Sequence, residues 1–178
     1  MELDDIIELI RRSAESTGKF DSLRGTIIGT WACIESAIDR SNHYGWWYTE
    51  RGVADKIPVS LGRKVKLFEE INRDLLPFES LRGTGAQLLA RVNSLFDDRH
   101  WMAHGYLLVE KSGEDHWVVQ KHDFPRDTGG LLTVERTFTL EELHTLRGDL
   151  MHLALDFSGY LRAMAQQVDK HPREDRGR

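Results

Sequence analysis

The hydrophobic period of this chain changes within the stretch Asp97-Asp98-Arg99-His100-Trp101-Met102-Ala103-His104-Gly105-Tyr106-Leu107-Leu108-Val109. Before this stretch, apolar residues recur every three or four positions, which is typical of a helix that buries one face. After Gly105, apolar residues follow one another as they do in strands. Because glycine is favoured just after the last turn of a helix, we expect a long helix to end at His104 and strands to follow.

Downstream of Gly105 the sequence predicts a small antiparallel sheet. Residues 106–110 and 116–120 are apolar runs that flank the polar turn Ser112-Gly113-Glu114-Asp115. This is the pattern of a β-hairpin with a short turn. A third run with strand character covers 131–138. We therefore expect three neighbouring strands in this region.

The last helix has a clear start in the sequence. Thr139 and Glu142 are spaced as in a capping box, in which each side chain accepts a hydrogen bond from the other residue's backbone. From Leu143 to Met164, apolar residues then recur at helical spacing. The sequence predicts one long amphipathic helix there.

Upstream of the stretch, four amphipathic segments are expected to be helices, at 3–18, 21–40, 61–75 and 81–104. Gly18 is expected to end the first of them, and the aromatic segment 41–59 to be a loop. Pro77 is expected to separate the third from the fourth, because proline cannot donate a backbone hydrogen bond.

Together these elements predict a mainly α fold, a helical bundle of about five helices with a small antiparallel β-sheet inserted before the last helix. A single helical domain is expected at 1–168, with the β insertion at about 106–138. The charged segment 169–178 is expected to be a disordered tail.

Composition sets limits on the class of protein. With 178 residues, 40% hydrophobic and 30% charged, the chain is long enough for one globular core. Its one cysteine, Cys33, excludes an intrachain disulfide and a cysteine-held zinc, which favours a reducing cytoplasm. We expect no signal peptide and no membrane span. The net charge of -5 argues against general nucleic-acid binding but allows a local basic cleft.

Small residues recur at every fourth position of the 21–40 segment, at Gly25, Gly29, Cys33 and Ala37. Two glycines inside a helix cost about 1 kcal/mol each relative to alanine, so a close-packing role is expected. The stripe indicates either tight packing inside the bundle or a seam between two subunits.

Two further segments could bind an anionic, ring-containing substrate. Trp46 and Trp47 lie near Arg51 and Lys56, and rings beside cations can stack on unpaired bases. The alternative is that these rings cap the core of the bundle.

The second segment is the basic run Arg63, Lys64 and Lys66. It could be a phosphate-binding strip that neutralises an RNA backbone. The alternative is an ordinary solvated helix face.

The opening stretch also carries the candidate chemistry, in Arg99-His100-Trp101-Met102-Ala103-His104-Gly105. This string resembles the R-x4-6-H motif of the HEPN superfamily and is similar to its RNxxAHG form, with His100 where asparagine is usual. A second pair with the same spacing, Arg147 and His152, has Gly148 after the arginine instead of a polar residue. The HEPN superfamily contains helical bundle proteins of bacterial defence, toxin–antitoxin and RNA-processing systems.

The resemblance implies a metal-independent endoribonuclease that works as a homodimer on single-stranded RNA and needs no cofactor. It implies that Arg99 holds the phosphate and that His104 transfers protons, with His100 assisting. A cognate antitoxin or another protein partner is consistent with such a system. The alternative is a non-catalytic HEPN-like domain that binds RNA, a nucleotide or a protein partner through the same cleft.

Helical geometry limits how Arg99 and His104 can cooperate. Residues five apart lie about 140° apart around a helix axis, so the two side chains of one chain point in different directions. Bringing both side chains to one phosphate therefore requires a symmetric second subunit or an unwound last turn at Gly105. In the structural alternative, His104 interacts with the helix C-terminus and Arg99 pairs with Asp97, Asp98 or Glu35.

A metal site is the competing chemical interpretation. Asp97, His100 and His104 share one helical face at spacings that can hold a divalent ion. Further ligands would be needed, and the candidates are His144, His152 and Asp156.

Overall fold

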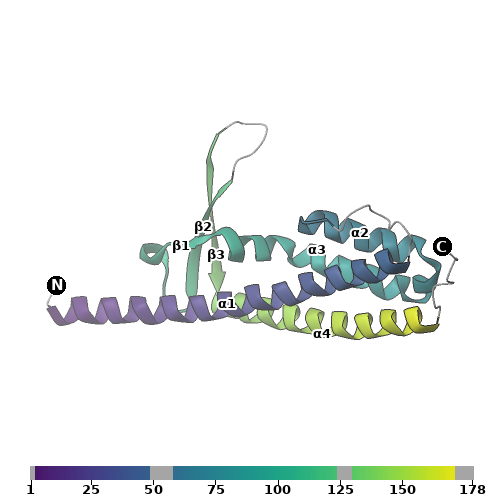
Figure 1. Ribbon diagram of the computed structural model, residues 1–178. Helices are drawn as coiled ribbons and strands as arrows, with labels where there is room; N and C mark the ends of the chain where they lie inside the picture. Colours follow the sequence, from purple (N-terminus) through teal and green to yellow (C-terminus); the bar gives the residue numbers. More distant parts are fainter. Residues whose placement is uncertain (1–2, 49–57, 124–129, 171–178) are drawn as a thin grey trace. The chain divides into compact units, whose positions relative to one another are not determined.

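The computed structural model describes residues 3–48, 58–123 and 130–170, and this part of the chain is mainly α-helical (Figure 1). The elements in chain order are α1 (Leu3–Tyr48), α2 (Leu61–Asp74), the 3₁₀ helix η1 (Leu76–Leu81), α3 (Arg82–His104), β1 (Tyr106–Leu107), the 3₁₀ helix η2 (Val109–Lys111), β2 (His116–Asp123), β3 (Leu132–Thr139) and α4 (Leu140–Lys170). The three strands form one antiparallel sheet directly before the last helix. The predicted fold class is confirmed.

The chain divides into two compact units. The first comprises Met1–Thr30 with Leu95–Leu150, and the second comprises Trp31–Ser94 with Met151–Arg178. The sheet belongs to the first unit and α2 to the second. Helices α1, α3 and α4 each contribute one segment to both units.

The predicted break at Gly18 is wrong, because α1 is one continuous helix through that position. Gly18 is exposed, with no other group within 4 Å of where a Cβ would lie. Its cost to the helix is about 1 kcal/mol. Burying Phe20 and Leu23 just after it gains about 1.5–3 kcal/mol for each side chain, which is enough to keep the helix intact.

The prediction of a loop from residue 41 is also wrong for residues 41–48, which complete α1. Ser41 and Asn42 are buried, but both side chains have backbone partners: Ser41 Oγ donates to Ala37 O and Asn42 Nδ2 to Lys64 O. These bonds offset part of the cost of burying the two polar side chains, although Asn42 Oδ1 has no hydrogen-bond partner among the described residues. Arg51 and Lys56 lie outside the described residues.

Glycine at position 45 allows the end of α1 to approach α2 closely. A Cβ there would lie 2.5 Å from Ile71 Cδ1. No side chain fits at that distance, so the approach of these two helices requires glycine.

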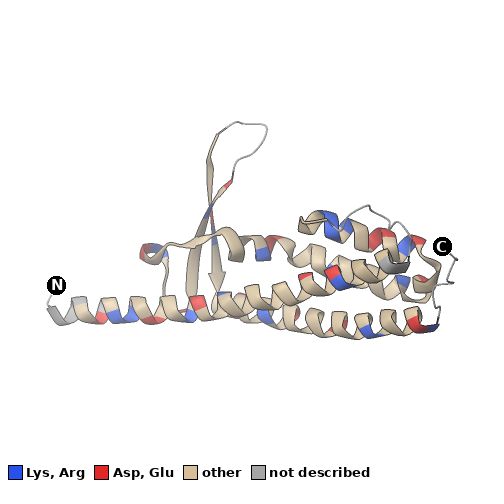
Figure 2. Cartoon of the chain, in the orientation of Figure 1, with Lys and Arg blue, Asp and Glu red and all other residues tan. Residues whose placement is uncertain are grey.

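Ion pairs run along the exposed N-terminal part of α1, where Figure 2 shows acidic and basic side chains interspersed. Arg11 pairs with Glu8 at 2.7 Å and with Glu15 at 2.6 Å, and Arg12 pairs with Glu8 at 2.8 Å. This charged surface agrees with a second observation: among the described residues, no helix is both long and apolar enough to cross a membrane.

The sheet has the strand order β1-β2-β3. β1 is shorter than predicted, because 109–111 form the 3₁₀ helix η2 in place of more strand. The predicted turn closes where Gly113 N donates to His116 O. β2 and β3 then pair along all eight residues of each strand, from His116 opposite Thr139 to Asp123 opposite Leu132.

The predicted capping box at the start of α4 is confirmed. The backbone N–H of Thr139 donates to Glu142 Oε2 at 2.7 Å, and the backbone N–H of Glu142 donates to Thr139 Oγ1 at 3.1 Å. The hydrogen bond from the Thr139 backbone N–H lowers the pKa of the Glu142 carboxyl, and the Thr139 side chain acts in the same direction. The helix then continues to Lys170, two residues beyond the predicted domain end.

Each unit has its own apolar core. In the first unit the core residues are Phe20, Leu23, Ile27, Trp101, Met102, Trp117, Val119, Phe138, Leu143, Leu146 and Leu150. In the second unit they include Trp31, Ile34, Ile38, Leu67, Phe68, Ile71, Phe78, Leu88, Leu89, Val92, Leu153, Phe157, Tyr160 and Met164. The predicted α3 motif thus lies at the end of a helix that is anchored in the core of the first unit by Trp101 and Met102.

Candidate active site

Two histidines lie side by side on the last turn of α3. His100 and His104 are four residues apart, which places them on one face of the helix. Their ring centroids are 4.7 Å apart. His100 is half-buried and His104 is exposed. A pair of adjacent imidazoles, one of them open to solvent, can accept a proton and donate another.

The end of α3 is fixed by contacts from outside the motif. Arg24 on α1 reaches the last turn, where its Nε donates to Met102 O at 2.6 Å and its Nη2 to Gly105 O at 2.9 Å. These bonds satisfy carbonyls that a helix end leaves without partners. No sequence pattern connects residues 81 positions apart, so this contact could not be predicted.

Gly105 ends α3 as predicted, but its main role is to allow close packing. A Cβ there would lie 2.3 Å from Val119 Cγ1 and 2.7 Å from Trp101 O. The φ of Gly105 is outside the left-handed region, so the usual conformational reason for glycine at a helix end does not apply. Glycine lets β2 pack directly against the turn that carries the histidines.

Lys121 lies on the inward side of β2 and joins this cluster. The residue is 8% exposed. Its Nζ lies 4.6 Å from the centroid of the Trp101 ring and 3.4 Å from Asp123 Oδ2. Lys121 was not predicted as part of a site, although alternation could have shown it: Trp117, Val119 and Lys121 share one face of the strand, and the first two are buried hydrophobic residues.

The environment lowers the pKa of His100. Burial of the ring is the main cause, and the nearby charges of Lys121 and His104 act in the same direction. Asp123 and Asp97 oppose the shift. His100 is therefore neutral at pH 7, the state in which an imidazole accepts a proton.

Arg99 is half-buried and lies about 140° around the helix from His104, as the spacing requires. The proposed ion pairs of Arg99 are not formed. Asp97 and Asp98 pair with Arg136, at 3.6 Å and 2.6 Å. Glu35 pairs with Lys64 at 3.1 Å. Within the described residues Arg99 forms no hydrogen bond or ion pair, which leaves its guanidinium available to a ligand or to another chain.

The metal interpretation finds no support in the arrangement of donors. Within the described ranges, no three His, Cys, Asp or Glu side chains are grouped as a metal ion needs. Asp97, one of the predicted ligands, pairs with Arg136. His144, His152 and Asp156 lie along α4, and Asp156 pairs with Arg91 at 2.5 Å.

The residues predicted to bind substrate belong to the second unit. Trp46 is 46% exposed and, with Arg40, His43, Tyr44 and Val168, lines a hollow of about 450 Å³. The side chain of Trp47 lies outside the described residues. Only Trp46 of the predicted tryptophan pair can therefore be examined.

The basic run on α2 is not a uniform strip. Arg63 and Lys66 are exposed, whereas the Lys64 side chain is 12% exposed. Lys64 Nζ donates to Glu35 Oε1 at 3.1 Å and to Asp39 Oδ2 at 2.7 Å. Its charge is therefore already neutralised inside the second unit, which favours a structural role for Lys64.

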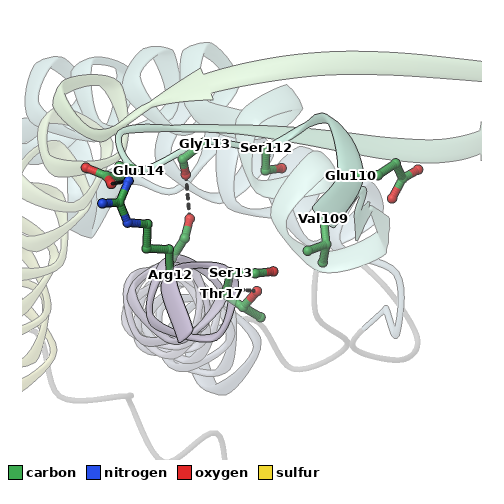
Figure 3. A pocket seen from close by; sticks show the side chains of 9 residues that line it. Arg12, Ser13, Thr17, Val109, Glu110, Ser112, Gly113 and Glu114 are labelled. Carbon is green, nitrogen blue, oxygen red and sulfur yellow. Dashed lines mark hydrogen bonds and ion pairs between the residues drawn. The ribbon is translucent and has the colours of Figure 1, made fainter. Parts of the chain in front are cut away.

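A separate hollow of about 390 Å³ lies between α1 and the turn that contains η2, lined among others by Arg12, Thr17 and Glu110 (Figure 3). The polar groups in it bind one another. Ser16 Oγ donates to Gly113 O at 2.5 Å, and Thr17 Oγ1 donates to Ser13 O at 2.8 Å. The hollow thus presents few unpaired polar groups to a ligand.

Comparisons of the chain with protein-family models, with curated proteins and with solved structures found no match.

Proposed function

We propose that this chain is a metal-independent endoribonuclease of HEPN type that acts as a homodimer on single-stranded RNA. The observation that carries the proposal is the His100–His104 pair, with ring centroids 4.7 Å apart on the last turn of α3. RNA cleavage without a metal uses the ribose 2′-hydroxyl as nucleophile. One group must take its proton and another must protonate the departing 5′-oxygen, and two adjacent imidazoles supply both functions.

The environments of the two rings suggest a division of roles. His100 is half-buried with a lowered pKa, so it is neutral and suited to accept the 2′-hydroxyl proton. His104 is exposed at the helix end and suited to donate a proton to the leaving oxygen. Each transfer is worth about 10²–10⁴-fold in rate.

Arg99 enters the site from the second subunit in this proposal. Its guanidinium forms no ion pair in the described part of its own chain and points away from His104 of that chain. A two-fold dimer brings Arg99 of one subunit to the histidines of the other, twice. There it would hold the non-bridging phosphate oxygens through a bidentate pair.

The test is cleavage of a mixed-sequence single-stranded RNA in excess EDTA, with analysis of the product ends. The expected products carry 2′,3′-cyclic phosphates. His104→Ala and Arg99→Ala should each lower the rate by about 100-fold or more without loss of helical signal. His144→Ala, an exposed histidine of α4, is the matched control and should cleave at the wild-type rate.

Mixing the two inactive variants tests the shared site. In a mixed dimer, one site combines Arg99 from the His104→Ala subunit with His104 from the Arg99→Ala subunit. Random exchange should then restore about a quarter of wild-type activity, since half the dimers are mixed and each has one complete site. If no activity returns although the subunits exchange, Arg99 and His104 do not act across the interface.

A non-catalytic binding domain is the second candidate. One observation favours it: within a single chain, the side chains of Arg99 and His104 leave the helix in different directions. A wild-type chain that retains RNA without releasing cyclic phosphate ends would establish binding and exclude cleavage.

A further inference from the structure

The position of Lys121 is unusual for its residue type. β2 alternates in burial, and its inward residues Trp117, Val119 and Lys121 are 0%, 1% and 8% exposed. Lysine is rarely this buried unless its charge is paired. The contacts of its ammonium group therefore show how far the charge of Lys121 is satisfied.

Lys64 shows how a lysine with the same degree of burial is satisfied in this molecule. The side chains of Lys64 and Lys121 are 12% and 10% exposed. Lys64 donates hydrogen bonds to two carboxylates, at 3.1 Å and 2.7 Å. Lys121 donates none within the described residues, and Asp123, at 3.4 Å, is the one carboxylate there that pairs with it. The ammonium group of Lys121 therefore has unused donors.

The Lys121 ammonium group lies close to the turn of α3 that carries the histidines. Lys121 Nζ lies over the Trp101 ring, next in sequence to His100, and its charge reaches the His100 ring. The neighbouring groups are His104, Asp123 and Asp97, and the carboxylate of Asp97 pairs with Arg136. A largely buried cation on the ring next to His100, paired with one carboxylate, favours an anion with several acceptor oxygens.

We propose that Lys121 is a phosphate-binding residue of the His100–His104 site, where its ammonium group holds a non-bridging oxygen of the RNA phosphodiester. The assignment of RNA rests on the proposed function, whereas the anion site rests on the burial and unused donors of Lys121. Each site would then hold the phosphate between Lys121 of one subunit and Arg99 of the other.

The experiment uses inorganic phosphate as the ligand and the histidine ring resonances of the full chain as the signal. In the wild type, phosphate should shift the His100 and His104 ring signals and raise the pKa of His100, because the anion stabilises the imidazolium. Lys121→Met should weaken phosphate binding by about tenfold or more, the effect of losing one charge-assisted hydrogen bond. Lys121→Arg should keep part of the affinity.

The matched control is Lys111→Met. Lys111 is exposed and donates to both oxygens of Glu135, at 2.7 Å and 2.9 Å. This variant loses the same charge from the same unit but should bind phosphate as the wild type does. Equal phosphate affinity in Lys121→Met and the wild type would overturn the proposal.

Thermal unfolding separates this role from a structural one. Because an apolar side chain replaces an under-paired buried cation, Lys121→Met should unfold at the wild-type temperature or above it. A clear fall in unfolding temperature would show that Lys121 mainly supports the fold and would contradict the proposal. If phosphate binds through Lys121 but the chain does not cleave RNA, the proposed anion site is supported and the proposed ribonuclease activity is contradicted.

Discussion

At the scale of single residues, the proposed site combines His100, whose pKa is lowered, with the largely buried Lys121 that contacts the adjacent Trp101 ring. Sequence reasoning identified His100, His104 and Arg99 from one short motif. It could not assign the His100 charge state, because burial and the Lys121 charge both come from the fold. Lys121 itself could have been found as the polar residue on the buried face of a predicted strand.

The lowered pKa of His100 should make the fold sensitive to acid. The unfolded chain takes up a proton near the ordinary histidine pKa of 6.5, whereas folded His100 does so only at lower pH. Its contribution to stability is therefore fully present above about pH 6.5 and is lost as the pH falls through the folded pKa. The drop in unfolding temperature from pH 7.5 to pH 5.5 should be smaller in His100→Gln than in the wild type. An equal drop in both proteins would contradict the lowered pKa of His100.

Gly105→Ala should destabilise the first unit by about 1–3 kcal/mol, because the added methyl group overlaps Val119 and the Trp101 carbonyl oxygen. Urea denaturation of the variant measures this cost. Adding Val119→Ala should not restore full stability, since the backbone contact at Trp101 remains. If Gly105→Ala unfolds at the same urea concentration as the wild type, β2 does not pack tightly against Gly105.

At the scale of elements, local signals were sufficient for some features and insufficient for others. The end of α3, the capping box of α4 and the three strands follow from patterns within a few residues. The continuity of α1 does not, because the cost of Gly18 is small and depends on whether Phe20 and Leu23 are buried. Arg24 at the end of α3 is a tertiary contact without a local pattern.

The small-residue stripe of α1 gives a test at this scale. Gly25, Gly29 and Cys33 are exposed, and no other group lies within 4 Å of the Cβ position of either glycine. The predicted tight packing within the bundle is therefore wrong for these three residues, whereas Ala37 is buried. If this face is solvated in solution, Gly29→Ala should stabilise the chain by up to about 1 kcal/mol.

If the same face is the seam between subunits, Gly29→Ala should instead weaken self-association. Analytical ultracentrifugation, run beside thermal unfolding, distinguishes the two results. A variant at Gly18, also exposed and open, supplies the comparison for helix propensity alone. The two alanine variants should differ only if the Gly29 face is covered by another chain.

At the scale of the whole molecule, charge limits how the proposed RNA substrate could be bound. The net charge is -5, and several cations are already paired within the chain, including Arg11, Lys64 and Arg136. Broad capture of the RNA backbone is therefore not expected. Recognition should depend on a few phosphates held at the site.

The salt dependence of RNA binding measures this number. For single strands, the logarithm of the binding constant falls by about 0.7 for each neutralised phosphate per logarithm of salt concentration. If only Lys121 and Arg99 contact phosphates, the logarithm of the binding constant for the inactive His104→Ala chain should fall by only about one to two per logarithm of salt concentration. A slope several times steeper would indicate a wider basic surface, such as one that includes Arg63 and Lys66.

The contact between Arg24 and the end of α3 has a consequence for the order of folding. Its two hydrogen bonds join residues 78 and 81 positions apart, and such non-local contacts form after local helices have appeared. The turn that carries both histidines is therefore completed late, when α1 has docked within the first unit. A partly folded chain would contain the whole motif but lack the two Arg24 bonds that fix the end of α3, so we expect the proposed activity to depend on this long-range contact.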